Sequence, residues 1–226
     1  MFSTYRAASL IPFAAVAIGL TAPAHAQDQT STDGPYAVAR AGVAIDSDLA
    51  PRENPPAVLN DDIDFGSGFA GEIGGGYKFS NFRIEGTVGY SSVKIDDERS
   101  GGGFADNGRL RSLNLGLSAY ADIPLDEMIV PYIGGGIGAS RVDGRLTRGL
   151  GTPATVASFD DKDWGFQWHL DAGVGIKATD RTTIELGARY TRTNSLSFDG
   201  RLNAGPATYE PRLSSVSGMI GIRQAF

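Results

Sequence analysis

Charged side chains suited to ion pairing or acid–base chemistry recur at alternate positions, with apolar residues between them. Arg83 and Glu85 stand two residues apart in one such stretch, and Glu185 and Arg189 stand four apart in another. An extended strand places alternate side chains on one face, so these groups share a polar face. Carboxylates and guanidiniums on such a face can pair with one another, line an ion path or act as acid and base. The candidate charge network comprises Arg40, Glu72, Lys78, Arg83, Glu85, Asp122, Asp171, Lys177, Glu185, Arg189 and Arg223.

The sequence offers no pattern for a cofactor or a metal. The glycine-rich run at 134–138 superficially resembles a phosphate-binding loop, but such a loop needs a following helix, and 139–141 continues a strand pattern. The chain has no cysteine, which excludes thiolate metal sites and disulfides. Acidic clusters at 61–64, 96–98 and 160–163 lack EF-hand spacing, and we interpret them as solvated loop charge. We therefore expect neither cofactor nor metal.

The elements that must position the charges are strands, because apolar residues recur with a period of two in stretches of about ten. In 166–178, Phe166, Trp168 and Leu170 lie on one face, whereas His169 and Asp171 lie on the other. One face is suited to hydrocarbon and the other is not. The same pattern predicts eight strands, at 36–45, 68–79, 82–91, 109–123, 130–141, 166–178, 182–193 and 213–226.

The connections between these strands alternate in length. Short turns are predicted at 80–81, 124–128 and 179–181, and long polar loops at 46–67, 96–108, 142–163 and 194–212. The pattern predicts an all-β fold, an eight-stranded antiparallel transmembrane up-and-down β-barrel with short turns at the periplasmic end. Two aromatic levels agree with interfacial girdles, one of Tyr90, Phe166, Trp168 and Tyr190 and the other of Tyr77, Phe79, Phe82 and Phe226. A soluble sandwich or lipocalin-like barrel also alternates, but it buries its apolar face.

The N-terminus predicts export. Residues 1–26 comprise a short segment ending in Arg6, an apolar stretch at 7–20 and small residues around His25, which is the plan of a Sec-type signal peptide. We expect domains at 1–26, the signal peptide, and 27–226, the barrel. Net charge is −6 without a Lys/Arg cluster in the sequence, which argues against nucleic acid as a partner.

The chain resembles the OmpA-like and opacity-like outer-membrane β-barrel family, in particular the small surface-antigen porins of alphaproteobacteria. The resemblance rests on Gly34-Pro35-Tyr36, Gly74-Gly75-Gly76-Tyr77, the run 131–138 and the terminal Phe226. It implies a location in the bacterial outer membrane after signal-peptide cleavage, with Phe226 as an assembly signal, although Gln224 departs from the apolar residue usual there. The implied partners are outer-membrane lipid, lipopolysaccharide, the barrel assembly machinery and a surface ligand bound through the outer loops.

Three functions compete on the sequence alone. We favour an envelope-structural and surface-interaction role, in which the charges pair and hold the lumen closed. The alternative is a small porin, in which the same pairs exchange partners along a narrow ion path. A lipid A-modifying enzyme is less favoured, because such barrels use a His with a nearby Ser and no such motif flanks His169. We expect His169 to make a hydrogen bond in the lumen, and we expect no enzyme.

Overall fold

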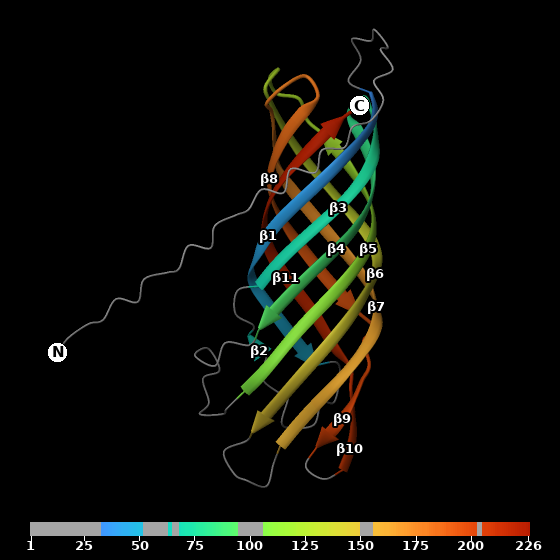
Figure 1. The fold of residues 1–226 in the computed structure, drawn as a ribbon, viewed down its shortest axis with the longest axis vertical. Helices are drawn as coiled ribbons and strands as arrows, with labels where there is room; N and C mark the ends of the chain where they lie inside the picture. The colour runs from blue at the N-terminus through green and yellow to red at the C-terminus, as the bar shows by residue number, and fades with distance from the viewer. Residues whose placement is uncertain (1–32, 52–62, 65–67, 95–105, 150–155, 203–204) are drawn as a thin grey trace, which may run out of the picture. The chain divides into compact units, whose positions relative to one another are not determined.

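Eleven strands make up the described part of a computed structural model of the chain, which covers residues 33–51, 63–64, 68–94, 106–149, 156–202 and 205–226 (Figure 1). The predicted signal peptide, residues 1–26, lies outside the described residues. The strands are β1 (Gly34–Pro51), β2 (Ile63–Asp64), β3 (Gly68–Phe79), β4 (Phe82–Lys94), β5 (Asp106–Asp122), β6 (Ile129–Gly149), β7 (Val156–Lys177), β8 (Thr182–Asn194), β9 (Phe198–Leu202), β10 (Gly205–Tyr209) and β11 (Pro211–Ala225).

Eight of these strands close into an antiparallel barrel. The order β7-β6-β5-β4-β3-β1-β11-β8 is completed by pairing of β8 with β7, so that no edge is left along the central part of the sheet. The predicted fold class and the positions of its eight strands are confirmed. β1 begins, and the chain ends, at one end of the barrel, and β9 and β10 lie at the opposite end (Figure 1). Among the described residues, no helix is long and apolar enough to cross a membrane.

Apolar side chains cover the outside of the barrel, and polar side chains fill it. On β4, Phe82, Ile84 and Val88 are 65%, 50% and 48% exposed, whereas Arg83 and Glu85 are fully buried. Such a surface is stable only against hydrocarbon, because it exposes a continuous apolar band. Tyr77, Phe79, Phe82 and Phe226 face outward near the short turns, and Tyr90 and Phe166 face outward toward the other end.

The short turns agree with the prediction, but two of the predicted long loops are wrong. β6 continues to Gly149 and β7 begins at Val156, so 142–163 is mostly strand. The segment 194–212 carries the hairpin β9–β10, which pairs with β7 through Ala157 and Phe159. Toward these extensions the polarity of the two faces is reversed. Arg141, Asp143 and Arg145 face outward, whereas Val142 and Leu146 are buried. Water surrounds this part of the barrel, so the apolar face turns inward.

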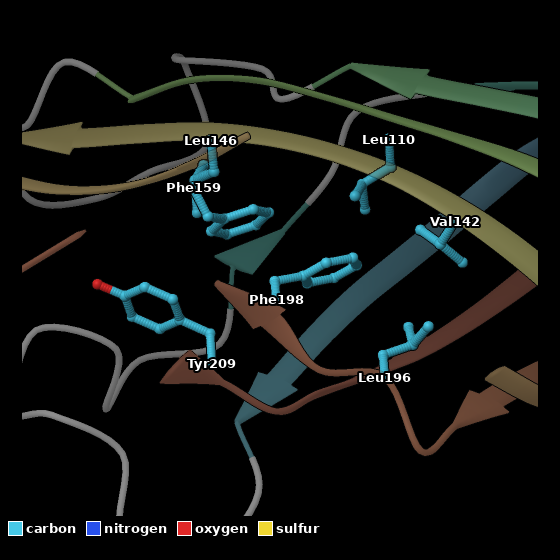
Figure 2. Packing of buried hydrophobic residues seen from close by; sticks show 7 residues of the cluster. All are labelled: Leu110, Val142, Leu146, Phe159, Leu196, Phe198 and Tyr209. Carbon is cyan, nitrogen blue, oxygen red and sulfur yellow. The ribbon is translucent and has the colours of Figure 1, made fainter. Parts of the chain in front are cut away.

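The buried apolar residues of these extensions form a cluster inside one mouth of the barrel (Figure 2). The rings of Phe159 and Phe198 stack with centroids 5.1 Å apart, and Tyr209 packs 5.8 Å from Phe159. We call this group the mouth cluster; it comprises Leu110, Val142, Leu146, Phe159, Leu196, Phe198 and Tyr209. It ties the hairpin β9–β10 to the inner face of β5, β6 and β7.

Replacement of the ring at the centre of this cluster should free the hairpin without opening the barrel. Phe198→Ala removes a fully buried ring, which costs about 3–5 kcal/mol in a packed core. We expect amide exchange in β9 and β10 to accelerate while exchange in β3 and β4 stays unchanged. Arg201→Ala, at an exposed position of the same hairpin, is the control. Equal acceleration in both variants would contradict a role for the mouth cluster.

Candidate functional site: the ion-pair layer in the lumen

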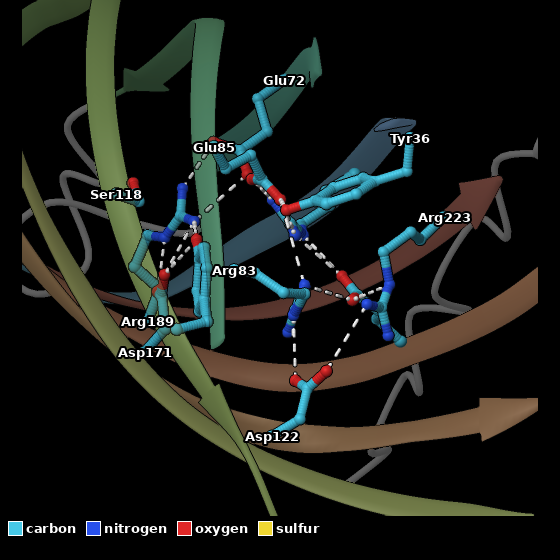
Figure 3. A network of polar contacts seen from close by, with 12 residues as sticks. Tyr36, Glu72, Arg83, Glu85, Ser118, Asp122, Asp171, Arg189 and Arg223 are labelled. Atoms are coloured by element: carbon cyan, nitrogen blue, oxygen red, sulfur yellow. Dashed lines mark hydrogen bonds and ion pairs between the residues drawn. The ribbon is translucent and has the colours of Figure 1, made fainter. Parts of the chain in front are cut away.

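Nine charged side chains from seven strands meet in the barrel interior (Figure 3). Each points into the lumen because it stands at one of the alternate, inward-facing positions of its strand, and most are nearly or fully buried. We call this group the ion-pair layer; it comprises Arg40, Glu72, Arg83, Glu85, Asp122, Asp171, Glu185, Arg189 and Arg223. The structure therefore brings together nine of the eleven residues predicted for the charge network.

Arg40 on β1 is the hub of the layer. Its guanidinium lies 2.9 Å from Glu72, 2.5 Å from Glu85 and 2.8 Å from Glu185. The contact with Glu85 uses two nitrogens and both carboxylate oxygens, the bidentate geometry that makes arginine pairs strong and directional. One side chain of β1 thus joins β3, β4 and β8 across the lumen.

The remaining arginines extend the layer in two directions. Arg189 donates to Glu72 at 2.5 Å and to Asp171 at 2.6 Å. On the other side, Arg83 donates to Asp122 at 2.9 Å and to Glu185 at 3.1 Å. Arg223 lies 3.1 Å from Glu185 and 3.6 Å from Asp122. Each buried guanidinium therefore contacts carboxylates from at least two other positions.

The charges of the layer nearly balance. Four arginines face five carboxylates, and Lys78 lies 4.0 Å from Asp122 at the edge of the layer, which supplies a fifth cation. Lys177, the eleventh predicted residue, has no carboxylate within 4.0 Å among the described residues, and it lines a small cavity instead. Balance matters because an unpaired charge in a low-dielectric interior is very costly.

Three tyrosines complete the layer. Tyr36 donates to Glu85 at 3.1 Å, and Tyr120 donates to Asp171 at 2.9 Å. The guanidinium of Arg83 lies 4.7 Å from the ring centroid of Tyr120 and 5.3 Å from that of Tyr132, within cation–π range of both. Sequence reasoning missed the tyrosines, although all three share the inward parity of their charged neighbours.

Inward glycines make the room that these rings occupy. A Cβ added at Gly173 would lie 2.6 Å from the hydroxyl of Tyr132, and one added at Gly187 would meet the same hydroxyl at 2.6 Å. The glycine run at 134–138 follows the same logic, because a Cβ at Gly134 would collide with the ring of Tyr120. These glycines are spacers that let tyrosines cross the lumen.

Separate cavities lie at the two edges of the layer. A cavity of about 130 Å³ reaches Glu72 and Arg189, and its wall carries the hydroxyl groups of Thr87, Ser112 and Ser140. Another, of about 50 Å³, reaches Asp122 and Arg223 from the end that carries the short turns. The two share no lining residue.

His169 lies beside a serine that is distant in sequence. Its Nε2 is 3.0 Å from the hydroxyl oxygen of Ser118, and Asp171 lies 3.6 Å from the same nitrogen. A catalytic triad places the carboxylate at the other ring nitrogen, within hydrogen-bond distance. Here both neighbours face one nitrogen, and Asp171 is already bound by Arg189 and Tyr120. The arrangement is that of a lumen hydrogen bond, as expected for His169, with a serine partner that sequence reasoning missed.

Two carboxylates fasten the hairpin at the mouth. The backbone amide of Ser197 donates to Asp163 at 2.8 Å, and that of Asp199 donates to Asp161 at 2.9 Å. The amides of Asp199 and Lys162 hold the pKa of Asp161 below its ordinary value of 3.8. Within the described ranges, no cluster of three or more His, Asp or Glu residues could hold a metal ion.

The pKa of Asp161 predicts an acid-sensitive hairpin. A lowered folded-state pKa means that the stabilisation is present above the ordinary value of 3.8 and is lost as pH falls through the folded-state value. We expect the hydrogen-exchange protection of the Asp199 amide, corrected for the intrinsic exchange rate, to decrease as the pH falls below 3.8. Asp161→Asn should remove the pH dependence, and Asp160→Asn, which breaks a contact to the side chain of Arg145, should keep it. An unchanged pH profile in Asp161→Asn would contradict the assignment.

Removal of the hub should destabilise the barrel far more than removal of a surface ion pair. Arg40→Met removes the close cation of the fully buried Glu85 and one partner each of Glu72 and Glu185, and breaking such a buried pair costs about 3–5 kcal/mol. Arg145→Met breaks an exposed pair with Asp160, whose side chains are 71% and 62% accessible, and should cost about 0–1 kcal/mol. The measurement is urea unfolding of the refolded protein in lipid vesicles. Equal losses of unfolding free energy in the two variants would mean that the contacts of Arg40 add no more stability than a surface ion pair.

The chain is similar to known proteins in sequence and in fold. The chain is 31% identical over 157 residues to an uncharacterized protein of Brucella abortus, an alignment covering 59% of this chain. A match with the same figures is found in Brucella melitensis, and the chain spans about half the length (55%) of these curated relatives. The solid-state NMR structure of outer membrane protein AlkL is 17% identical, covers 89% of this chain and 94% of its own, and has a TM-score of 0.50. Neisserial surface protein A is 20% identical over 85% of this chain and 97% of its own, with a TM-score of 0.48.

The family is set by a match along most of the chain. The sequence profile of the outer membrane protein beta-barrel domain matches residues 13–217. That span contains the whole ion-pair layer except Arg223. The chain belongs to the outer membrane protein β-barrel family, whose location is the bacterial outer membrane.

Proposed function

We propose that this barrel serves the envelope as a structural and surface-interaction protein, with a lumen that the ion-pair layer holds closed. The supporting observation is the hub: Arg40 contacts carboxylates of three other strands, while its neighbours Arg83 and Glu85 are fully buried. An ion that crossed this level would have to separate buried pairs. Each charge left alone there costs several kcal/mol, so the paired state is strongly favoured.

A small porin is the second candidate, and one feature favours it. Three buried polar atoms of the layer have no hydrogen bond among the described residues: Nη2 of Arg83, Oδ2 of Asp122 and Nε of Arg223. All three belong to residues at the edge nearer the short turns. The pairing is thus looser there than around Arg40, and exchange of partners between Arg83 and Arg223 would be the first step of a gated path.

An enzyme fits the site less well. Ser118 and His169 are both buried, and the carboxylate near them does not orient the imidazole in the way a triad requires. The carboxylates of the layer are held by arginines rather than left as acid or base. We therefore assign no catalytic residue.

The barrel's orientation and partners follow from the same proposal. After Sec export and cleavage after residue 26, the assembly machinery would recognise the terminal Phe226, which is exposed at the barrel end. The short turns would lie in the periplasm, and the mouth cluster would lie at the cell surface. Any surface ligand would meet the connections at that end, where loops carry most recognition.

Single-channel conductance in a planar bilayer tests the closed lumen. We expect folded wild-type protein to be silent and Arg83→Ala to show openings, because the substitution leaves the looser edge of the layer unpaired. Arg145→Ala, on the exposed outer face of β6, should stay silent. A shift of gel mobility on boiling in detergent would verify folding of each sample. Reproducible wild-type openings that change in Arg83→Ala and not in Arg145→Ala would overturn the proposal and establish a porin.

A further inference from the structure

Six basic side chains gather on the outer surface just beyond the apolar band, on β4, β5, β6 and β7. All are exposed and occupy the outward parity of their strands. We call this group the basic patch; it comprises Lys94, Arg109, Arg111, Arg141, Arg145 and Lys162. Because the charged lumen lies on the opposite face of the same strands, the patch is independent of the ion-pair layer.

Strand register fixes the depth of the patch. Leu113, Arg141 and Trp164 form one row across three strands, and on these strands no described residue nearer the mouth is an exposed large apolar residue. The next row toward the mouth contains Arg111, Asp143 and Lys162. Two residues along a strand advance about 7 Å. The patch therefore starts at the boundary between the apolar band and water, where lipid headgroups lie.

The patch carries a positive excess that its own residues do not neutralise. Two acidic neighbours among the described residues are already paired: Asp160 lies 2.7 Å from Arg145, and Asp143 lies 3.9 Å from Lys162. For Lys94, Arg109, Arg111 and Arg141, no ion pair exists within the described part of the chain. The excess is notable in a chain whose net charge is −6.

Like charges also face one another directly across the strands. Arg109 is the register partner of both Lys94 on β4 and Arg145 on β6. Such directly opposed like charges destabilise a sheet by a fraction of a kcal/mol to about 1 kcal/mol. An anion bound between these basic side chains would replace their mutual repulsion with attraction to the anion.

We propose that the basic patch binds the phosphate groups of lipopolysaccharide in the outer leaflet. Guanidinium groups bind phosphate through paired hydrogen bonds. Trp164 and Tyr90 flank the patch at the depth where aromatic rings anchor in the interface, which favours a lipid over a soluble anion. The assignment rests on the proposed orientation, with the mouth cluster outside, but not on the state of the lumen.

Binding of lipid A to the refolded barrel in neutral detergent micelles tests the proposal. The probes are lipid A with both phosphates, the same lipid dephosphorylated, and inorganic phosphate, each scored by native mass spectrometry. A lysine or arginine near an anionic surface contributes about 1 kcal/mol, roughly fivefold in affinity. We expect Arg109→Ser to bind phosphorylated lipid A roughly fivefold more weakly, and Arg109→Ser/Arg111→Ser to lose more.

Matched variants separate the patch from net charge. Arg181→Ser removes the same charge from an exposed periplasmic turn and should bind as wild type does. Arg109→Lys/Arg111→Lys keeps the charge and should retain most of the affinity. Equal binding of dephosphorylated lipid A, equal losses in Arg109→Ser and Arg181→Ser, or equally tight binding of inorganic phosphate would each overturn the proposal. The conductance experiment reads the lumen alone, so failure of one proposal is distinguishable from failure of the other.

Discussion

The structure depends on one constraint: hydrocarbon surrounds the barrel, so the strands must turn their charges inward and pair them there. Eight strands enclose a lumen that side chains nearly fill, so most of the charges there are buried away from water. Arg40 meets the constraint by contacting carboxylates of three strands at once. The ion-pair layer therefore follows from the apolar outer surface, which leaves the lumen as the place for these charges.

Tyrosine and glycine solve the packing problem that the charges create. The ring of Tyr120 covers Arg83 and its hydroxyl binds Asp171, so one residue both shields a cation and satisfies a carboxylate. A ring this large fits only because glycine stands on the facing strand. Several of the 31 glycines in the chain, such as Gly134, Gly173 and Gly187, thus have a physical cause in the narrow lumen.

Much of this was predictable, because a strand's period of two assigns each residue to a face without knowledge of the fold. Parity placed Arg83, Glu85 and Glu185 in the lumen, and loop lengths gave the antiparallel order. The pairing of Ser118 with His169 was not predictable, since the two are 51 residues apart and meet only through the register of β5, β6 and β7. The outer extensions of β6 and β7 were misread as loops because an apolar outward face was taken as the mark of a strand. Above the hydrocarbon that face becomes polar, and Val142 and Leu146 turn inward.

The position of the hub in the chain also bears on how the barrel can assemble. Arg40 lies on β1, whereas Glu185 lies on β8 and Arg223 on β11. In an open sheet whose β1 had not yet paired with β11, Glu185 would keep Arg223 of the adjacent strand β11, but it would lack its contacts with Arg40 and Arg83 across the lumen. The carboxylate would then have one of its three arginine partners. Closure of β1 against β11 therefore completes the sheet and brings Arg40 to Glu185 in the same step, so that barrel closure and completion of the ion-pair layer are coupled.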